Sequence, residues 1–546
     1  MNLSFIDIAI FVGYILLIVG MGLFVSRKKD GKEKTSSDYF LASKSLPWWA
    51  IGASLIAANI SAEQFIGMSG SGFAIGLAIA SYEWMAAITL IIVAKFFLPI
   101  FIKKGLYTIP QFIEERFSTN LKTILAVFWV ALFVFVNLTS VLFLGGKALD
   151  TIIGTGDGSL IIPAIIGLAT IAAAYSLYGG LSAVAWTDVV QVVLLVVGGL
   201  LTTIIALDYV TPDGGVFAGL AHVYDKAGDK FHMILSRDNP QYFNLPGIAV
   251  LIGGMWVANV YYWGFNQYII QRALAAKSLK EAQRGLAFAA FMKVIIPLIV
   301  VVPGIIVFVL YTQPEGTTVI PGIKEAFAST GGGINYDKAY PWLIAQFIPV
   351  GVKGLVVAAL TAAIVSSLAS MLNSTSTIFT MDIYKPYLAK KDSSEKKLVS
   401  VGRITAAVAL VVAMFIAPVM GNIPQMFQYI QEYTGLVSPG ILGVFLMGIF
   451  WKKTTNKSAI VGVLVSIVVA LLLKSTAVDL PFLDQMFYTL LITIVIIMGV
   501  SLTTSDEIED PKGIDLTAKI FKTDSVFNIA TYALLIILAL LYTMFW

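Results

Sequence analysis

Residues 285–311 read GLAFAAFMKVIIPLIVVVPGIIVFVLY, a stretch in which Lys293 is the only charged side chain. An α-helix rises about 1.5 Å per residue, so a stretch of this length crosses the ~30 Å hydrocarbon core of a bilayer. The apolar residues are continuous and do not alternate with polar ones, which excludes a strand of a membrane β-barrel. The stretch therefore predicts a membrane-spanning helix with one lysine at depth.

The rest of the chain has the same character. Of its 546 residues, 58% are hydrophobic and 12% are charged, and the mean hydropathy is +0.87. Soluble domains carry about 25% charged residues, so most of this chain is predicted to lie in lipid. We expect an all-α integral membrane protein of about fourteen transmembrane helices. They are predicted near 5–25, 47–71, 76–102, 123–147, 159–178, 184–207, 246–270, 284–311, 347–383, 399–419, 424–451, 457–475, 483–503 and 524–546.

Several classes of function lack their usual residues. The net charge is only +4 and no basic–aromatic cluster occurs, so no nucleic-acid partner is expected. With no cysteine and two histidines, thiolate chemistry and a His-rich metal site are not expected either. The sequence offers no Ser-His-Asp set, metal cluster or phosphate loop for an enzyme and no repeated filter motif for a channel. A membrane sensor or receptor stays an alternative, although it would usually need an appended signalling domain.

Basic residues mark one side of the predicted bundle. They lie in five loops that follow odd-numbered spans, and the positive-inside rule makes that side cytoplasmic. The first span lacks the flanks of a signal peptide and is expected to be retained. An even number of spans then places both termini outside, with the longer loops 208–245 and 312–346. The basic residues are Arg27, Lys28, Lys29, Lys32, Lys34 and Lys44, then Lys103, Lys104, Arg116 and Lys122, then Arg272, Lys277, Lys280 and Arg284, then Lys385, Lys390, Lys391, Lys396 and Lys397, and finally Lys452, Lys453 and Lys457.

The parity of the spans permits an internal repeat. If spans two to six and seven to eleven were copies of one five-helix unit, the second copy would be inverted, because five is odd. Transporters with inverted repeats bind their substrates near the midplane between the repeats. The predicted units are a first helix with its basic loop (1–46), repeat one (47–207), an extracellular loop (208–245), repeat two (246–451) and three C-terminal helices (452–546).

Five polar side chains on separate spans fall at comparable depth in the membrane. Lys293, for example, lies roughly 13 Å from the preceding loop by the helical rise. A charge at the centre of a span costs ~2.5–3.5 kcal/mol, so such residues are candidates for function. The alternative is a set of interhelical hydrogen bonds that tie the bundle together. The five residues are Gln64, Glu83, Asn259, Lys293 and Gln431.

The chemistry of this set favours one class of ligand. Amides with one acid and one base offer donors and acceptors in many directions, which suits a neutral polyhydroxylated molecule. A fixed anion would instead need an arginine fork, and none occurs at this depth. Glu63 and Glu432 follow or precede the two glutamines and point about 100° away on a helix, so we expect structural partners for them.

Hydroxyls form a second group. Residues 359–370 read ALTAAIVSSLAS, and the hydroxyls of Ser366 and Ser367 suit a hard cation such as sodium. The alternative, close helix packing through small residues, is favoured by the residues alone. Helix breaks are weakly signalled at 57–62 and at Gly253–Gly254, and more strongly at Pro439–Gly440.

Aromatic residues lie near the polar set, notably Tyr82, Tyr262 and Phe427. They fit an interfacial belt or core packing. They also fit rings that stack on the apolar face of a sugar and close its site.

Three stretches resemble the sodium/solute symporter family, most closely its bacterial sodium/galactose (sodium/glucose-type) members. They are SLIAANISAEQFIG at 54–67, YYWGFNQYIIQR at 261–272 and FQYIQEYTGLVSPG at 427–440. The resemblance covers nearly the whole chain. It implies a leucine-transporter-type fold of two inverted five-helix repeats with flanking helices, breaks in spans two and seven, and a place in the bacterial inner membrane.

The resemblance also implies a function and a set of residues. The function is symport of a galactose- or glucose-like sugar with co-transported sodium by alternating access, and the alternative is another solute such as an amino acid, a vitamin or sialic acid. The sugar site would be Gln64, Glu83, Asn259, Lys293 and Gln431, the inner gate Tyr262 held by Asn59, and the outer gates Met68, Tyr82 and Phe427. Sodium would bind the carbonyls of Ala57, Ile60 and Ala363 and the hydroxyls of Ser366 and Ser367, and would leave past Asp188.

One residue departs from the family pattern. Where the galactose site of the family has a serine, this chain has Ala86, one helical turn from Glu83. The lost hydrogen bond is worth ~0.5–1.5 kcal/mol, so preference for galactose is open while sugar binding as a class is retained.

Overall fold

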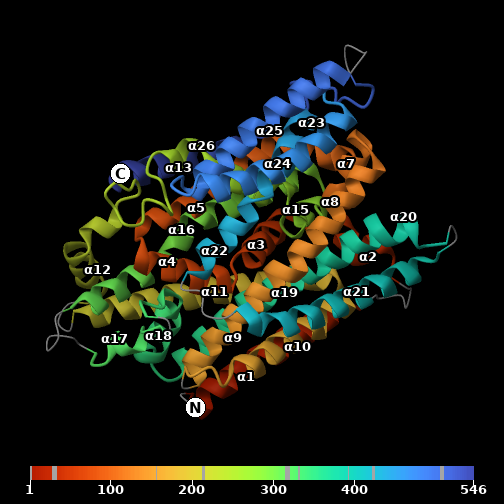
Figure 1. The fold of residues 1–546 in the computed structure, drawn as a ribbon. Coiled ribbons are helices and arrows are strands. Elements are labelled where there is room, and N and C mark those ends of the chain that lie inside the picture. Colours follow the sequence, from red (N-terminus) through yellow and green to blue (C-terminus); the bar gives the residue numbers. More distant parts are fainter. Residues whose placement is uncertain are drawn as a thin grey trace.

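Long apolar helices make up nearly all of the computed structural model (Figure 1). The structure describes residues 3–27, 34–154, 156–211, 215–313, 320–329, 332–390, 393–420, 425–504 and 510–546. Over these ranges the chain forms α-helices, short 3-10 and π-helical turns and two isolated β-bridges, with no β-strand. The predicted all-α class is therefore confirmed.

Eleven helices in the described residues are long and apolar enough to cross a membrane. They are α1 (Phe5–Val25), η3 to α6 (Leu77–Lys103), α8 to α9 (Thr119–Ile153), α10 (Ile161–Gly179), α11 (Leu181–Val210), α16 (Leu279–Thr312), α19 to α20 (Val352–Tyr387), α21 to η9 (Glu395–Met420), α24 (Asn456–Thr476), α25 (Phe482–Thr504) and α26 (Ser525–Met544). A twelfth span results if α22 (Met426–Gly435) and α23 (Ser438–Phe450), which meet at 48°, are taken together. The count of fourteen is therefore not confirmed by these criteria.

The two other predicted spans are interrupted helices. The segment predicted at 47–71 consists of α3 (Trp48–Asn59), the π-helical turn η2 (Glu63–Met68) and α4 (Ser69–Ala74). The segment predicted at 246–270 consists of α13 (Ala249–Ile252), α14 (Gly254–Phe265) and α15 (Gln267–Leu274). The interruptions lie five predicted spans apart, as two copies of one five-helix unit would place them.

Polar side chains stabilise the first interruption. After Asn59 the backbone is extended at Ile60 (φ −81°, ψ 102°). The Gln64 side-chain oxygen then accepts hydrogen bonds from the backbone N–H (3.0 Å) and hydroxyl (3.1 Å) of Ser61. A buried backbone N–H left without a partner is costly, so this side chain replaces the missing helical carbonyl. In the second interrupted span Asn266 is the extended residue (φ −85°, ψ 121°).

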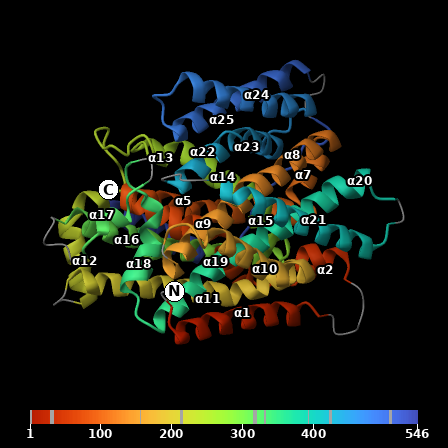
Figure 2. The same ribbon diagram turned by 60° about the horizontal axis from the view of Figure 1, so that its bottom comes forward.

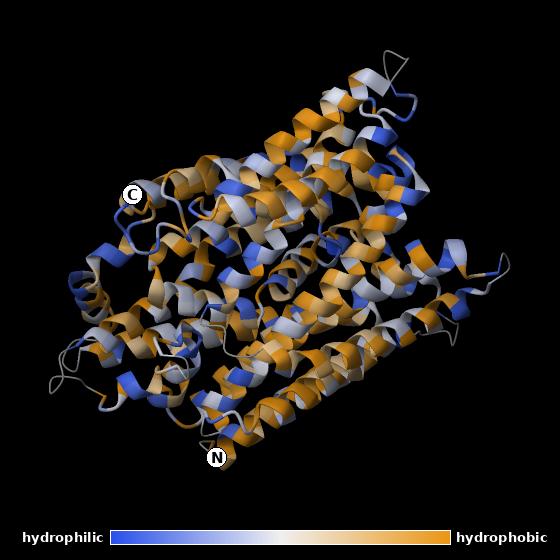
Figure 3. Ribbon diagram, viewed as in Figure 1, coloured by the Kyte–Doolittle hydropathy of each residue, from blue (hydrophilic) through white to orange (hydrophobic). Residues whose placement is uncertain are grey.

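Burial separates central from peripheral helices. In α19 (Val352–Ile378) and its continuation, 94% of the most apolar window is buried, whereas the value is 17% for α1 and for α26. Figures 1 and 2 show α1 along one edge of the bundle and α24 with α25 along the opposite edge. Exposed apolar residues follow the outer helices, and hydrophilic residues gather at the loops (Figure 3). Such a surface suits lipid as the surrounding solvent.

The connecting helices lie at two opposite ends of the bundle. Both termini lie at the end that carries α12 (Gly215–Lys226), α17 (Ile323–Ala326) and α18 (Ala339–Phe347) (Figure 1). The other end carries α2 (Ser36–Leu41), α7 (Ile109–Arg116) and α20 (Lys385–Tyr387), where the basic loops were predicted. Of those basic residues, Lys28, Lys29, Lys32 and Lys391 lie outside the described part of the chain.

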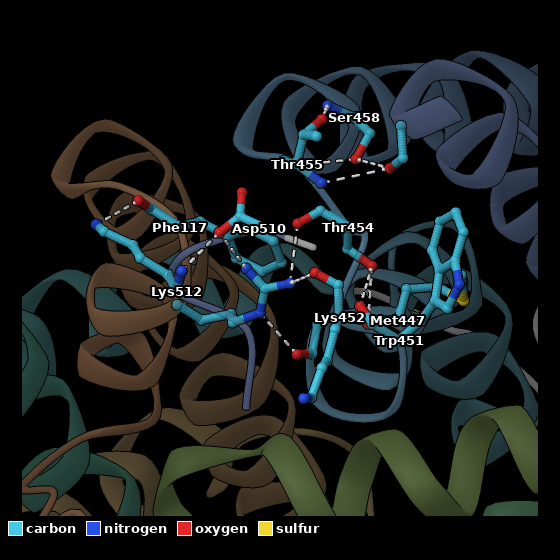
Figure 4. A network of polar contacts seen from close by, with 12 residues as sticks. Phe117, Met447, Trp451, Lys452, Thr454, Thr455, Ser458, Asp510 and Lys512 are labelled. Carbon is cyan, nitrogen blue, oxygen red and sulfur yellow. Dashed lines mark hydrogen bonds and ion pairs between the residues drawn. The ribbon is translucent and has the colours of Figure 1, made fainter. Parts of the chain in front are cut away.

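Arg116 joins distant segments at the predicted cytoplasmic end. The side chain is fully buried at the end of α7. Its guanidinium donates to the carbonyls of Gly448 (2.8 Å), Lys452 (3.4 Å) and Thr454 (2.9 Å) and to the carboxylate of Asp510 (3.2 Å). Figure 4 shows Lys452, Thr454 and Asp510 within one network of polar contacts. The arginine thus fixes α7 to the end of α23 and to the segment before α26.

Replacement of this arginine should destabilise the bundle. We expect Arg116→Ala to lower the free energy of unfolding by about 2–4 kcal/mol, because three carbonyls and one carboxylate lose a charged donor. Lys104→Ala is the matched control, since that lysine forms only a partly exposed pair with Glu115 and should change stability by less than about 1 kcal/mol. Thermal unfolding midpoints in one detergent at one heating rate measure both, and equal shifts would contradict the assignment.

Candidate functional site

A cavity lies between the helices of the bundle, beside the first interruption. Helices α14, α16 and α22, the turn η2 and α5 (Ser81–Ile92) contribute its walls. All five polar residues predicted to bind substrate line it, namely Gln64, Glu83, Asn259, Lys293 and Gln431. Ala86, the departure from the family pattern, also lies on the wall. Residues from five separate elements therefore share one void.

A buried ion pair forms one wall of the cavity. Lys293 Nζ donates to a Glu83 carboxylate oxygen at 2.5 Å, and both side chains are almost completely buried. The ammonium also donates to the Asn59 side-chain oxygen and lies 5.0 Å from the centre of the Trp263 ring. Two charges at membrane depth thus satisfy each other. They also leave polar atoms next to an open volume.

The amides are placed for different partners. Gln64 holds the interruption through its oxygen, as described above, while it faces the cavity. Asn259 donates to the carbonyl of Met255 one turn earlier, at 3.2 Å. Gln431 is half-buried on α22. Together they offer both donors and acceptors to a molecule in the cavity.

The residues predicted as outer gates all line this cavity, and two of them are in contact. The rings of Tyr82 and Phe427 pack edge to face with centroids 5.1 Å apart, and Met68 also lines the cavity. All three side chains are buried. The contact between Tyr82 and Phe427 is the one expected of a closed outer gate.

The residue predicted as the inner gate is held by two hydrogen bonds. The Tyr262 hydroxyl accepts from the Asn59 side-chain nitrogen at 2.9 Å, as expected for Asn59, and pairs with the Tyr268 hydroxyl at 2.6 Å. Tyr268 was not singled out from the sequence. Only its position six residues further along the same motif could have indicated it.

Glu63 differs from the sequence-based expectation. It lines the cavity, and its Oε1 atom is buried without a hydrogen-bond partner among the described residues. The expectation of a structural partner was wrong because the angular argument assumed a regular α-helix, whereas the chain is unwound just before Glu63. For Glu432 the expectation holds, since it pairs with Lys474 at 3.2 Å and points away from the cavity.

Oxygen atoms gather behind the interruption, where sodium was predicted. The last carbonyls of a helix lack intrahelical partners, and α3 ends at Asn59, so the Ala57 and Ile60 carbonyls lie at such an end. Facing them on α19, Ser367 donates to the Ala58 carbonyl at 2.9 Å. Ala363 and Ser366 lie within one turn of Ser367. The set consists of carbonyl and hydroxyl oxygens, which fits a hard cation.

Asp188 lies next to this oxygen pocket. It is fully buried on α11 and accepts hydrogen bonds from Ser366 (2.5 Å) and Ser54 (2.5 Å). The guanidinium of Arg272 lies 3.4 Å from the same carboxylate. Arg272 also donates to Ser370, to Ser54 and to the backbone carbonyl of Tyr268. Ser54 and Arg272 were missed as site residues. Arg272 was assigned to a basic loop, and Ser54, within the span predicted at 47–71, carries neither a charge nor an amide.

Hydrogen bonds thus connect the pocket to the cavity. Arg272 bonds the Tyr268 backbone, the Tyr268 hydroxyl bonds Tyr262, and Tyr262 bonds Asn59 beside Lys293. Every link in this series lies in the two interrupted spans or on a helix packed against them. Ordering of one site can therefore alter the other.

Interrupted helices around a central polar cavity with an oxygen pocket define a class of secondary transporters. The family model described as the sodium:solute symporter family matches residues 39–466. This chain therefore belongs to the sodium:solute symporter family.

Relatives match over nearly the whole chain. It is 63% identical to the sodium/glucose cotransporter of Vibrio parahaemolyticus over 545 residues, which are 100% of this chain and 99% of that protein. It is 34% identical to human sodium/myo-inositol cotransporter 2 over 483 residues, 85% of this chain and 69% of the relative. A solved structure of a Na+-coupled sialic acid symporter in a substrate-bound outward-open state superposes with a TM-score of 0.78 at 24% identity, covering 92% of this chain and 98% of that one. The fold is the leucine-transporter type.

The ion pair at the cavity generates a test of its energetics. Lys293→Met should lower the unfolding midpoint more than the double variant with Glu83→Gln, because the single change leaves a buried carboxylate without a cation, a cost of about 3–5 kcal/mol. The midpoints are measured without added solute. A double variant whose loss equals the sum of the two single losses would contradict the coupling.

Proposed function

We propose that this protein couples the inward flow of sodium to uptake of a glucose- or galactose-like monosaccharide by alternating access. One observation carries the proposal. A single cavity combines an acid, a base and three amides, and an oxygen pocket lies behind the same helix interruption. The name of the 63% identical relative, a sodium/glucose cotransporter, supports it.

The cavity suits a sugar rather than a charged solute. Glu83 and Lys293 neutralise each other, so a neutral ligand adds no buried charge. The two charged groups and the amides can each bond a hydroxyl, and the Tyr262 ring supplies an apolar face for the pyranose. We add Glu63 to the predicted ligands because its side chain lines the same cavity and its Oε1 atom has no hydrogen-bond partner among the described residues.

Sodium and sugar would be coupled through the interruption of span two. A sodium ion on the Ala57 and Ile60 carbonyls would order the backbone between Ala57 and Gln64. Asn59, whose side chain holds Tyr262, lies within this segment. Sodium binding would then favour the state whose sugar site is complete, and coupling requires such a difference in affinity between states. Sugar binding would close the outer gates, and release of Tyr262 would open the inner path past Asp188.

The driving force is sufficient for accumulation. One charge that falls through about 100 mV yields ~2.3 kcal/mol, and a tenfold sodium gradient adds ~1.4 kcal/mol. At one sodium per sugar, the sum sustains a sugar gradient of several hundred-fold.

The proposed setting is the bacterial inner membrane, with both termini outside. The two repeats would be 47–207 and 246–451, separated by the extracellular loop 208–245 and followed by three helices at 452–546. The basic loops at the end with α2, α7 and α20 support this orientation.

Substrate class is tested by competition. Uptake of labelled glucose by the purified protein in liposomes should be inhibited by unlabelled hexoses and not by amino acids, vitamins or sialic acid. Because Ala86 replaces the serine of the family's galactose site, glucose should compete at least as well as galactose. Absence of competition by every hexose would remove the sugar assignment.

Substrate-site variants should lose sugar binding. We expect Lys293→Ala and Gln64→Ala to weaken binding at least about 30-fold, since each removes bonds worth ~2 kcal/mol or more from a buried site. Lys474→Ala is the matched control, because that lysine pairs with Glu432 away from the cavity. Equilibrium binding of labelled sugar to purified protein measures the effect, and wild-type affinity in both site variants would exclude this site.

An ion-site variant should change the response to sodium. Ser366→Ala should raise the sodium concentration for half-maximal uptake about tenfold or more, because a ligand oxygen is lost, with little change in the unfolding midpoint. Ser400→Ala, an exposed hydroxyl that bonds only within its own helix, serves as control. An unchanged sodium response would remove Ser366 from the ion site.

A further inference from the structure

The segment between α16 and α19 lies over the outer half of the first interrupted span. Phe73 on α4 packs edge to face against Phe327 (5.4 Å) and Tyr336 (5.1 Å) of this segment. Gly70, one turn earlier on α4, allows the backbone of Tyr336 to approach this helix closely, since a Cβ atom at Gly70 would lie 2.9 Å from the Tyr336 carbonyl. The segment is thus packed directly on α4.

Asp337 extends from this segment to the helix that holds an outer gate. It lies in the short turn η7 (Tyr336–Lys338) and is only 1% exposed. Its Oδ2 atom accepts the backbone N–H of Met426 at 3.1 Å. Met426 is the first residue of α22. The N-cap residue of α22, Gln425, makes no capping hydrogen bond with its side chain. A carboxylate at this position also interacts favourably with the helix dipole.

The residue after Met426 is Phe427, which closes the cavity against Tyr82. Gly67 allows the backbone of Phe427 to approach the turn η2, because a Cβ atom there would lie 2.9 Å from Phe427 Cβ. The start of α22 is therefore held between Asp337 and the interrupted span. A movement that separates the first residues of α22 from η7 would break the bond to Asp337.

A cation lies near Asp337. Burial raises the pKa of Asp337 to about 7, and Lys147 and the Met426 backbone bond oppose that shift. Lys147 on α9 (Thr139–Ile153) is itself buried and donates to Asn335 at 3.3 Å. The second oxygen of Asp337 has no hydrogen-bond partner among the described residues and faces Gly70. A buried carboxylate with one backbone hydrogen bond and one nearby cation is costly, so we look for a role that explains its presence.

We propose that Asp337 is a positioning residue that holds Phe427 in the closed outer gate. The inference rests on the proposed function for the identity of the outer side. Asp337 fixes the N-terminus of α22 to the segment on α4, and loss of this bond shifts the population toward the outward-open state. A single charged hydrogen bond is enough to change such a population about tenfold.

The chain contains no cysteine, which allows a clean test of gate opening. Ala86→Cys introduces a single thiol on the wall of the cavity that Phe427 and Tyr82 also line. Cells or proteoliposomes with this reporter are treated from outside with a membrane-impermeant methanethiosulfonate reagent. The rate of labelling then measures the fraction of protein with an open outer gate.

We expect Asp337→Ala in the reporter to increase the labelling rate about tenfold. Asp337→Asn, which keeps an acceptor oxygen but loses the charge, should give a smaller increase. Asp225→Asn makes the same change on the exposed helix α12, where the carboxylate pairs with Lys226, and should leave the rate unchanged. Labelling of Asp337→Ala at the unchanged reporter rate would overturn the proposal.

A second variant changes α4, the other partner of this contact, and keeps the proposal testable if Asp337→Ala folds poorly. Gly70→Ala places a methyl group against Asp337 and Tyr336, and it should also increase labelling several-fold. The same variants without the cysteine should show a lower maximal uptake rate together with a lower KM. The maximal rate falls because closure is slower, and KM falls because a larger fraction of the protein is in the outward-open state. A structural defect alone would lower the maximal rate and leave KM unchanged. The labelling result does not depend on the sugar. Unchanged labelling with normal uptake therefore rejects the role of Asp337 and leaves the proposed function standing. Absent uptake in the wild type rejects the proposed function and leaves the role of Asp337 standing.

Discussion

The unwound backbone between Asn59 and Glu63 is the constraint on which the rest of the structure depends. In a membrane every backbone polar group needs a partner inside the protein, so an interruption survives only where side chains or a wet cavity satisfy it. Here Gln64 bonds Ser61 and Ser367 bonds the Ala58 carbonyl, while Gln64 and Asn59 also line the central cavity. The central cavity and the predicted sodium ligands thus adjoin the same helix break.

Buried charges around this break are compensated in pairs. Glu83 with Lys293 and Asp188 with Arg272 lie at membrane depth with almost no exposure. Isolated, each would be too costly to keep charged. Paired and hydrogen-bonded, the four groups have no net charge, so a neutral ligand in the cavity adds no buried charge.

The sequence allowed much of this arrangement to be predicted, because membrane helices are long, apolar and separated by charged loops. Depth along each helix brought Lys293, Glu83, Asn259, Gln64 and Gln431 to one level, and the cavity contains all of them. Side-chain direction near a break could not be predicted in this way, so Glu63 was assigned to the wrong face. The interruptions in spans two and seven came from resemblance, since no proline marks them and local chemistry favoured Pro439–Gly440. That signal was correct as well, because α22 and α23 meet there at 48°.

The central claim is that sodium and a sugar use adjoining sites and move together. It is tested most directly by purified wild-type protein in sealed liposomes with labelled glucose, a tenfold inward sodium gradient and a membrane potential set negative inside. The account predicts transient accumulation of glucose above its external concentration, abolished when sodium is replaced by potassium or when the gradient is collapsed. Equal uptake with and without the sodium gradient would contradict it.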